Sequence, residues 1–305
     1  MAGKTEWIAV DWGTSNLRAW GIGADGAITF AASSEKGMGR LERTAFPAAL
    51  IEVVSGHVDQ EGEPLDVLIC GMAGARQGWR EAPYLEIPAD LGRLAEAAVR
   101  PEMPGLRFSP RILPGLCQRE PGSEDVMRGE ETQLLGLSRL MDGFSGVAVM
   151  PGTHSKWADL DGRLVGRFAT AMTGELFEVL GAHSVLRHSV TGGAGGPDSD
   201  EGFDTGIDIG LTRPETLVSE LFRIRPRSLL SGMSPSWCSG FLSGLLIGAE
   251  IGGFRRWISD GDVPLIGGTR LCGLYARGFD RLGVRTRVID ATEATLAGLK
   301  AAREL

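Results

Sequence analysis

One segment near the start of the chain combines residues that suit phosphate and magnesium chemistry. Asp11 ends an apolar run and is followed closely by Gly13, Thr14 and Ser15. A turn of this composition presents backbone N–H groups and hydroxyls to phosphate oxygens, and a carboxylate beside it can hold a hydrated magnesium ion. An ordinary hairpin turn has the same composition, so this segment alone leaves the two interpretations balanced.

A second turn of this kind lies in the other half of the chain. It contains Gly152, Thr153 and Ser155, and it also follows an apolar segment. Lys156 comes next, where a cation could meet a β- or γ-phosphate or form a surface salt bridge. Two such turns at matching places favour phosphate binding more strongly than either does alone.

A pair of glycines, Gly267 and Gly268, separates an apolar strand-like segment from a helix-like one. Because glycine has no side chain, the pair leaves the backbone bare for the close approach of a flat ligand. Glycines at such a turn are more often simple structural devices, so the pair by itself is a weak signal.

Two adjacent carboxylates, Glu130 and Glu131, follow Gly129. Either could accept the proton of a hydroxyl group as that hydroxyl attacks a phosphoryl group. The plainer interpretation is a solvated first turn of a helix, where the helix dipole favours acidic residues.

The composition is that of an ordinary globular protein without a nucleic-acid surface. The 305 residues include 31 Lys and Arg against 39 Asp and Glu, a net charge of −8, and no basic run stands out. The four cysteines are widely spaced, which suggests neither a zinc site nor disulfides. No secretory signal is apparent, and the apolar stretch 241–251 is too short to span a membrane. We therefore expect a cytoplasmic protein without nucleic-acid or membrane partners; the stretch 241–251 could be core or the surface of a homodimer.

The elements that must position these residues show a repeated plan. Strands are expected at 7–11, 17–22 and 27–32, with a hairpin turn at Asp25-Gly26, and a similar block of strands and turns occupies 146–170. The repeat indicates two structurally related halves, which we place at 1–142 and 143–305. Elsewhere helices and strands alternate, which predicts an α/β class with mixed sheets in both halves.

Helical spacing of apolar residues predicts the main helices. They are expected at 44–58, 90–99, 125–140, 174–187, 214–225, 235–257, 270–280 and from 292 onward. Residues 190–206, rich in Gly, Asp and Ser, are expected to form a loop.

Five segments, taken in order, carry a family resemblance. They are DWGTSNLR (11–18), RGEETQLLG (128–136), PGTHSKW (151–157), IGGTRLCGLYARGF (266–279) and DATEATLAGL (290–299). Together they resemble the signature segments of the actin-like sugar kinases. The resemblance narrows to the 2-dehydro-3-deoxygalactonokinase family on PGTHSKW and on three further segments, CGMAGARQGW (70–79), EAPYLEIPA (81–89) and MTGELFEVLGAHSVL (172–186).

The resemblance implies two RNase H-like (actin-like ATPase) domains with mixed sheets flanked by helices and an active site in the cleft between them. The cofactors would be ATP and Mg²⁺. Asp11 would organise the magnesium ion, and Gly13, Thr14 and Ser15 would form the first phosphate turn. The second turn and the adenosine contacts would come from the other domain, through Gly152, Thr153, Ser155, Lys156, Gly267 and Gly268.

The resemblance also implies catalytic and acceptor-binding residues. Related kinases have an Asp where this chain has Glu130, so Glu130 would be the base, and the second carboxylate beside it leaves that role open. The substrate is a six-carbon keto acid, whose carboxylate calls for an Arg or Lys. The candidates for contacts to this substrate are Arg18, Arg76, Gln77, Trp79, Arg128 and Glu175.

The implied function is ATP-dependent phosphorylation of 2-dehydro-3-deoxy-D-galactonate to its 6-phosphate in galactonate catabolism. The alternatives are a kinase for another sugar acid, such as the epimer 2-dehydro-3-deoxy-D-gluconate, and a phosphohydrolase of the exopolyphosphatase type. A non-enzymatic sensor with the same architecture is a further option.

Overall fold

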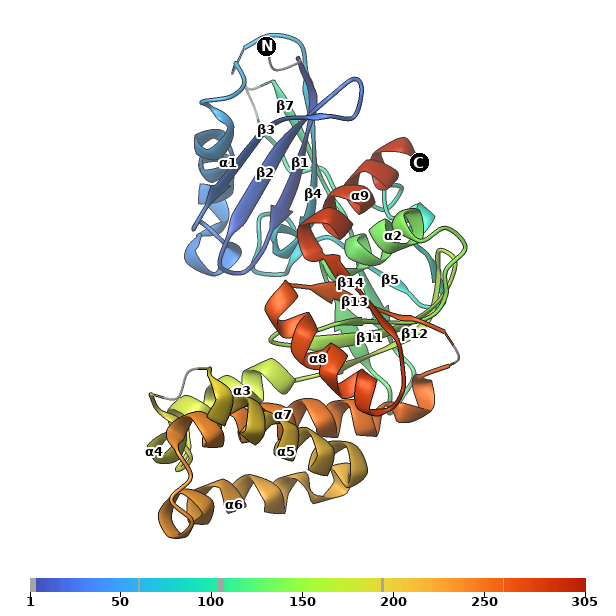
Figure 1. The fold of residues 1–305 in the computed structure, drawn as a ribbon. Helices are drawn as coiled ribbons and strands as arrows, with labels where there is room; N and C mark the ends of the chain where they lie inside the picture. Colours follow the sequence, from blue (N-terminus) through green and yellow to red (C-terminus); the bar gives the residue numbers. More distant parts are fainter. Residues whose placement is uncertain (1–3, 60, 104–106, 193–194, 260) are drawn as a thin grey trace. The chain divides into compact units, whose positions relative to one another are not determined.

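The computed structural model describes residues 4–59, 61–103, 107–192, 195–259 and 261–305. These residues form two compact units, shown in Figure 1. Unit 1 contains the described residues up to Ser145, together with Leu160–Phe168 and Ala291–Leu305. Unit 2 contains Gly146–Asp159 and the described part of Ala169–Asp290. The division at residue 142 that the sequence suggests stays a prediction.

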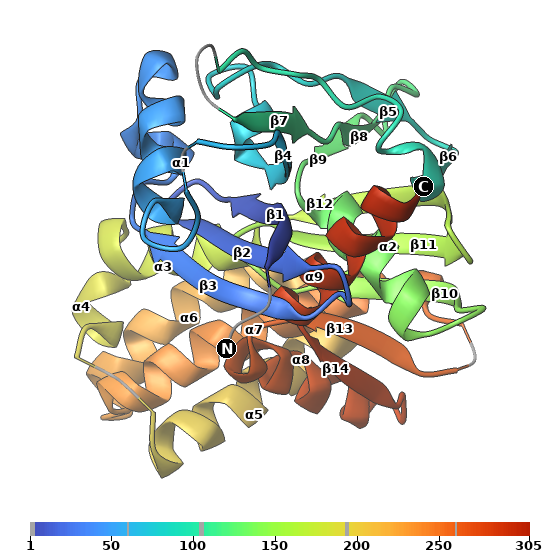
Figure 2. The same ribbon diagram turned by 90° about the horizontal axis from the view of Figure 1, so that it is seen from above.

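Unit 1 is built on a five-stranded mixed sheet with the order β3-β2-β1-β4-β7 (Figure 2). Its strands are β1 (Thr5–Trp12), β2 (Leu17–Gly23), β3 (Ile28–Ser34), β4 (Leu65–Gly71) and β7 (Phe108–Ile112). The first three form the expected antiparallel meander, and β4 adds parallel to β1. At the predicted hairpin turn Gly26 has a φ of 77°, a conformation that glycine adopts without strain.

One face of this sheet is covered by helix α1 (Phe46–Val54), whose apolar side chains join the core. At the centre of that core the rings of Trp12 and Phe46 lie with their centroids 4.9 Å apart, and Trp79 packs edge-on to Trp12 at 6.0 Å. Burial of these large rings stabilises the end of β1, where Asp11 is located.

Helices α2 (Glu130–Leu140) and α9 (Ala291–Glu304) lie side by side in unit 1 (Figure 1). Their backbones approach closely at two glycines: a Cβ on Gly136 would lie 1.9 Å from the Ala294 carbonyl oxygen, and one on Gly298 equally close to that of Thr132. The last helix of the chain therefore packs with the first unit and holds the N-terminus of α2.

A small three-stranded sheet and a strand pair complete unit 1. The sheet has the order β5-β8-β9, formed by β5 (Tyr84–Glu86), β8 (Gly115–Gln118) and β9 (Asp125–Met127). The strand β12 (Leu164–Ala171) pairs with β6 (Ala89–Asp90) through Leu164 and Val165. Short 3-10 turns and loops connect these strands.

Unit 2 has its own strands in the order β14-β13-β10-β11. They are β10 (Ser145–Met150), β11 (Ser155–Asp161), β13 (Val263–Gly267) and β14 (Thr286–Asp290). Helix α8 (Thr269–Arg281) follows β13 and packs its apolar face into the core of this unit. The strands β10, β11 and β13 and the helix α8 agree with the sequence expectation.

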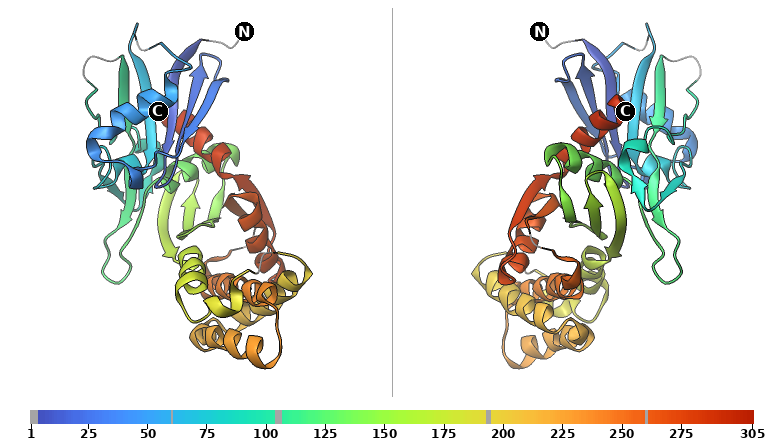
Figure 3. Two further views of the ribbon diagram at one scale, coloured as in Figure 1. Left: turned by 90° about the vertical axis from the view of Figure 1, so that its left-hand side faces the viewer. Right: turned by 90° about the vertical axis from the view of Figure 1, so that its right-hand side faces the viewer.

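The remaining helices of unit 2 gather in one group, coloured yellow to orange in Figure 3. They are α3 (Thr173–His183), α4 (Arg187–Val190), α5 (Pro197–Thr212), α6 (Leu217–Leu230) and α7 (Pro235–Gly253). Residues 241–251 lie in α7, and their large apolar side chains are buried in the unit, so this stretch is core.

Three sequence expectations were wrong. The helix expected at 90–99 is a short 3-10 turn at Leu91–Arg93, where the Asp90 carboxylate accepts a hydrogen bond from the N–H of Gly92. The helix expected from 125 begins only at Glu130, because residues 125–127 pair with β8 and Gly129 has a φ of 106°. The loop expected at 190–206 contains the first half of α5.

Two glycines of that segment, Gly202 and Gly206, are packing sites of α5, and Gly210 continues their spacing. Gly202, Gly206 and Gly210 recur at every fourth residue of α5, and a Cβ on each would lie within 2.6 Å of α7 backbone atoms. Glycines at this spacing therefore form one closely packed face of a helix. Among the described residues, no helix is long and apolar enough to cross a membrane.

Candidate active site

At the end of β1 the side chain of Asp11 is paired with Arg18 across the hairpin. The Arg18 Nη2 atom lies 2.6 Å from Asp11 Oδ2, and Arg18 Nη1 donates to the Thr292 hydroxyl at 3.2 Å. Burial raises the pKa of Asp11, while the positive charge of Arg18 and its hydrogen bond act in the opposite direction. The structure thus brings two predicted residues, Asp11 and Arg18, together at the start of α9.

The predicted first phosphate turn is held by a second backbone segment. The N–H groups of residues 37, 38 and 39 donate to the carbonyls of Ser15, Gly13 and Thr14, at 2.9–3.3 Å. Thr14 and Ser15 are exposed, and the turn lines a hollow of about 620 Å³ together with Arg18 and residues 33–35. The turn is therefore fixed by backbone hydrogen bonds while its hydroxyls are accessible.

Strand β4 ends beside Asp11, and helix α2 begins there. The Cys70 thiol lies 4.0 Å from Asp11 Oδ1, and a Cβ on Gly129 would be 3.4 Å from the Cα of Gly71. Burial, followed by the charges of Asp11 and Glu131, raises the pKa of Cys70 well above its usual range, so the thiol stays neutral. The strand ends thus bring Asp11 to the same place as the two glutamates of α2.

The two glutamates at the start of α2 have different surroundings. Glu131 is fully buried; it accepts hydrogen bonds from the N–H of Gly129 at 2.6 Å and from the Thr132 hydroxyl at 3.0 Å. Burial, and then the neighbouring charge of Glu130, raises the pKa of Glu131 to about 7. Glu130 is only partly buried and accepts from the N–H of Arg128 at 3.0 Å.

The Arg128 side chain is partly buried in unit 1. It is stacked over the Tyr84 ring at 4.3 Å, and Nη2 donates to the Ala82 carbonyl at 2.8 Å. Its Nε and Nη1 atoms are buried without a hydrogen-bond partner among the residues that the structure describes. Unpaired buried donors cost free energy, which makes this group receptive to an anionic ligand.

The other predicted acceptor residues of unit 1 are more scattered. Arg76 and Gln77 are exposed on the loop after β4. Trp79 is 7% exposed and lies in the core beside Trp12 and Phe46, so its position does not fit a wall of the substrate site. This aromatic side chain packs in the core of unit 1.

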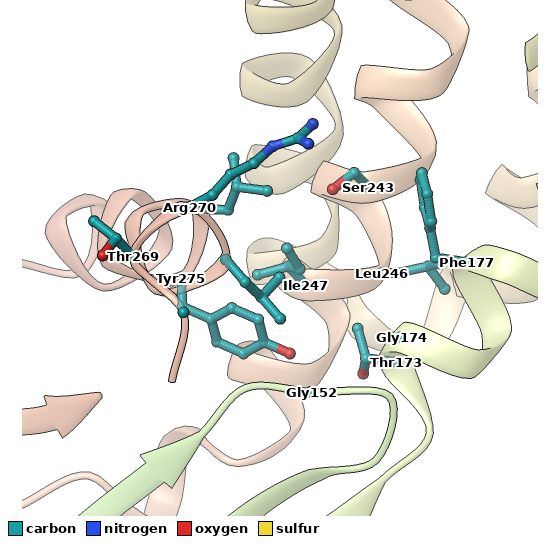
Figure 4. A pocket seen from close by; sticks show the side chains of 13 residues that line it. Gly152, Thr173, Gly174, Phe177, Ser243, Leu246, Ile247, Thr269, Arg270 and Tyr275 are labelled. Carbon is teal, nitrogen blue, oxygen red and sulfur yellow. The ribbon is translucent and has the colours of Figure 1, made fainter. Parts of the chain in front are cut away.

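Unit 2 contains a largely apolar pocket of about 560 Å³, shown in Figure 4. Phe177, Leu246, Ile247, Leu271 and Leu274 form apolar walls. Its polar lining includes Ser243, Thr269, Arg270, the Tyr275 hydroxyl, and the backbone at Gly152, Gly174 and Gly268. A flat apolar ring with a phosphate-bearing end is the kind of ligand that such a lining suits.

The predicted second turn forms one end of this pocket, against the start of α3. The N–H of Glu175 donates to the Thr153 carbonyl at 3.0 Å, and a Cβ on Gly174 would lie 2.4 Å from the Gly152 carbonyl oxygen. The N-terminus of a helix offers unpaired N–H groups and a positive dipole end. Here Thr173 and Gly174, at the start of α3, line the pocket.

Five predicted residues of unit 2 lie in different settings. Ser155 is fully buried and its hydroxyl lies 2.8 Å from that of Tyr275. Lys156 is 6% exposed and donates to the Thr170 hydroxyl at 2.7 Å. Glu175 faces His154, with 2.5 Å between Oε2 and Nε2. Gly267 is buried below the pocket, whereas Gly268 lines it.

The sequence interpretation missed most of the side chains that line the pocket. Ser243, Leu246 and Ile247 come from α7, whose sequence gave no sign of a site, and Phe177 comes from α3. Arg270 and Tyr275 stand inside the motif IGGTRLCGLYARGF, which was examined only for its glycines. Their polar side chains, which follow a glycine turn among apolar residues, were the signal in the sequence that could have indicated a binding site.

Within the described part of the chain, no group of three or more His, Cys, Asp or Glu residues could hold a metal ion. Magnesium retains several waters and takes one or two protein carboxylates, so a dedicated cluster is not required. Asp11, with one oxygen toward Arg18 and the other near a neutral thiol, fits this limited demand.

The fold is that of the actin-like class of ATPases and sugar kinases, as the sequence predicted. A crystal structure of component A of (R)-2-hydroxyglutaryl-CoA dehydratase from Acidaminococcus fermentans shares this fold, with a TM-score of 0.52 at 14% identity over 98% of both chains. The chain belongs to the 2-keto-3-deoxy-galactonokinase family, whose sequence profile matches residues 11–302.

Three relatives support this membership. A candidate 2-dehydro-3-deoxygalactonokinase of Rhizobium meliloti is 41% identical over 97% of this chain and 96% of its own length. The 2-dehydro-3-deoxygalactonokinase of Escherichia coli is 36% identical over 96% of each chain. The crystal structure of a candidate 2-dehydro-3-deoxygalactonokinase from Sinorhizobium meliloti superposes with a TM-score of 0.91, at 40% identity over 98% of both chains.

Proposed function

We propose that this chain is an ATP-dependent kinase that converts 2-dehydro-3-deoxy-D-galactonate to its 6-phosphate in galactonate catabolism. The observation that carries the proposal is the near full-length membership in a family whose relatives bear that name. The local chemistry supports it, because each unit contains a glycine turn lined by hydroxyls and one unit adds a large apolar pocket. The protein would be cytoplasmic.

In this proposal Glu130 is the catalytic base. Its carboxylate is partly exposed, whereas that of Glu131 is fully buried and already accepts two hydrogen bonds. Glu130 would take the proton of the terminal sugar hydroxyl as that oxygen bonds to the γ-phosphorus of ATP and ADP leaves. Glu131 would instead hold the Gly129 turn in the conformation that presents its neighbour.

The carboxylate of the substrate would be bound by Arg128. Arg18 already contacts Asp11 and Thr292, and Arg76 lies on an exposed loop, whereas Arg128 has two buried N–H groups without a partner among the described residues. A carboxylate accepting from that guanidinium would pair with its charge and satisfy one of these donors. Tyr84 would keep the guanidinium plane fixed by stacking.

The nucleotide would be bound by the pocket of unit 2, with its adenosine against the apolar walls and Gly268. Its phosphates would meet the N–H groups at Gly152, Thr153 and the start of α3. Magnesium, when bound with ATP, offsets negative charge on the phosphate oxygens. Asp11 would orient a water of its hydration shell, and Thr14 and Ser15 would contribute hydroxyls.

Coupled ADP release from the purified protein tests this proposal. The assay would contain MgATP and, in separate reactions, the galactonate-derived keto acid, its gluconate-derived epimer, glucose, or no sugar. We expect turnover that depends on the galactonate-derived acid and that falls at least 100-fold in kcat in Glu130→Gln. The matched control is Glu96→Gln, an exposed glutamate of the same unit, which should retain activity.

Other outcomes would contradict parts of the proposal. Equal kcat/KM for the two epimers would replace the galactonate substrate by a broader class of sugar acids. Phosphate release that does not depend on sugar would favour a phosphohydrolase, and tight nucleotide binding without turnover would favour a sensor.

A further inference from the structure

Glu250 is a buried carboxylate of unit 2 that none of the roles above uses. It lies on α7 and is 7% exposed. The Trp157 indole N–H donates to Oε1 at 2.7 Å, and the Tyr275 hydroxyl donates to Oε2 at 2.6 Å. Burial raises the pKa of Glu250, and the surrounding polar groups of Thr173, Tyr275, Trp157 and Ser155 act in the opposite direction. A buried carboxylate needs hydrogen-bond donors around it, and Glu250 has them.

These donors connect Glu250 to the elements that form the pocket. Since Tyr275 gives its proton to Glu250, the Ser155 hydroxyl 2.8 Å away is the donor to the Tyr275 oxygen. Ser155 is the first residue of β11, directly after the turn at 152–154. Thr173, the first residue of α3, lies beside Glu250 and Tyr275 and acts on the pKa of both. Together with the hydrogen bond from the Glu175 N–H to the Thr153 carbonyl, this network links β11, α3 and α8.

The three tied elements leave little freedom for the turn between them. Gly174 is packed against the Gly152 carbonyl, and the Glu175 N–H is bonded to the Thr153 carbonyl. In Figure 4 the Tyr275 side chain crosses the pocket from α8 toward Gly152 and Thr173. A shift of Ser155 or Thr173 would move the backbone N–H groups that line the pocket at this end.

We propose that Glu250 and Tyr275 are positioning residues of the nucleotide site, which hold Ser155 and Thr173 and thereby fix the turn at 152–154 against the start of α3. This inference rests on the proposed use of the pocket for ATP. A preorganised turn binds phosphate without first being ordered, so its loss weakens nucleotide binding more than it slows the transfer step.

The test is the affinity for MgATP measured by calorimetry, without any sugar, and the KM for ATP in the kinase assay. Tyr275→Phe keeps the ring and removes only the hydroxyl. We expect about a tenfold rise in Kd and in KM for ATP, the size of one lost hydrogen bond to a charged group. The kcat at saturating ATP and the KM of the sugar acid should stay within about threefold.

A double-mutant cycle distinguishes positioning from general destabilisation. Glu250→Gln combined with Tyr275→Phe should weaken ATP binding no more than about twofold beyond Tyr275→Phe alone, because both act through one chain. The matched control is Glu220→Gln, a carboxylate of α6 that is 1% exposed and paired with Arg223, away from the pocket. It should leave the Kd for MgATP unchanged.

Three results would overturn the inference. They are an unchanged Kd in folded Tyr275→Phe, a multiplicative effect in the double variant, and an equal weakening in Glu220→Gln. The calorimetry needs no sugar acid. Its result therefore does not depend on which sugar acid the enzyme phosphorylates. Undetectable MgATP binding by the unmodified protein would instead reject the nucleotide site itself.

Discussion

Glu130 and Glu131 are adjacent in sequence but lie in opposite environments. Glu131 points into the unit, where the Gly129 N–H and the Thr132 hydroxyl donate to it, and Glu130 lies at the partly exposed start of α2. Sequence alone left the choice of base open between them. Burial separates them, because a carboxylate enclosed by hydrogen bonds serves to hold the backbone, whereas an accessible one can receive a proton from a ligand.

The raised pKa of Glu131 predicts a pH-dependent stability. Its pKa of about 7 in the folded protein lies above the usual 4.5, so the folded state holds this proton more tightly than the unfolded state. The protonated Glu131 therefore stabilises the folded state at low pH, and this stabilisation is lost as the pH rises through about 4.5 to 7. Glu131→Gln should not show this loss. Between pH 4.5 and 8 its free energy of unfolding should therefore rise relative to that of the unmodified protein by on the order of 3 kcal/mol.

Urea unfolding of both proteins at pH 5 and at pH 8 measures this difference. Glu96→Gln, at an exposed glutamate, should show no such pH dependence relative to the unmodified protein. A free-energy difference between Glu131→Gln and the unmodified protein that is the same at both pH values would refute the assignment.

Arg128 is predicted to act on the acceptor and not on the nucleotide. Arg128→Met keeps much of the apolar contact with Tyr84 but removes the guanidinium donors. We expect the KM of the sugar acid to rise about 10- to 100-fold, since a charge-assisted pair is lost, while the KM of ATP stays within twofold. Initial-rate kinetics with each substrate varied in turn provide the measurement. An effect confined to the KM of ATP would contradict this role.

At the scale of the elements, glycine spacing decides how α5 and α7 pack. Gly202, Gly206 and Gly210 of α5 lie against the α7 backbone, and Gly240, Gly244 and Gly248 of α7 lie against that of α5. Without side chains at these positions the two helices approach more closely than ordinary helix pairs. Since α7 provides Glu250, Ser243 and Ile247, this contact also positions the pocket wall.

Gly206→Ala is therefore expected to destabilise the protein by about 1–3 kcal/mol, because its Cβ would lie 2.3 Å from the Phe241 carbonyl oxygen and the helices would have to separate. Gly273→Ala is the matched control: this exposed helical glycine of α8 has nothing within 4 Å of an added Cβ. It should stabilise by up to about 1 kcal/mol, because alanine favours helix. Thermal and urea unfolding would report both values, and a stabilised Gly206→Ala would contradict the packing argument.

At the scale of the whole molecule, the last helix of the chain belongs to the same compact unit as the first strands. Residues 291–305 form α9, which packs on α2 and touches β1 and β4 of unit 1. The first residues of α9 include Thr292, which accepts a hydrogen bond from Arg18. The end of the sequence therefore helps to hold the strand ends where Asp11 and Glu130 are found.

Gly298→Ala should consequently affect unit 1 and not the nucleotide pocket. An added Cβ would lie 1.9 Å from the Thr132 carbonyl oxygen, so α9 must move away from α2. We expect a loss of about 1–3 kcal/mol in unfolding free energy and a reduced kcat, with the Kd for MgATP within twofold. Glu304→Ala, which removes only the exposed pair with Arg139, should change stability by less than about 1 kcal/mol. Weakened MgATP binding in folded Gly298→Ala would contradict this separation.

The sequence by itself determined the repeated pattern of strands, the glycine turns and the α/β class. These features depend on neighbours along the chain: apolar alternation, a turn at Asp25-Gly26, and glycines after strands. The resemblance of five ordered segments then indicated the actin-like sugar kinases, and further segments indicated the family, which the comparisons confirm. Local patterns failed at residues 125–127 and 197–206, where strand pairing with β8 and packing against α7 decided the structure.

Only the tertiary structure decided which side chains meet. Trp79 is drawn into the core by Trp12 and Phe46, and Glu131 is buried beneath the start of α2. Glu250 accepts hydrogen bonds from β11 and α8, through residues that lie 93 and 25 positions away along the chain. Burial and hydrogen bonding depend on such distant contacts, and the spacing of residues along one chain does not contain them.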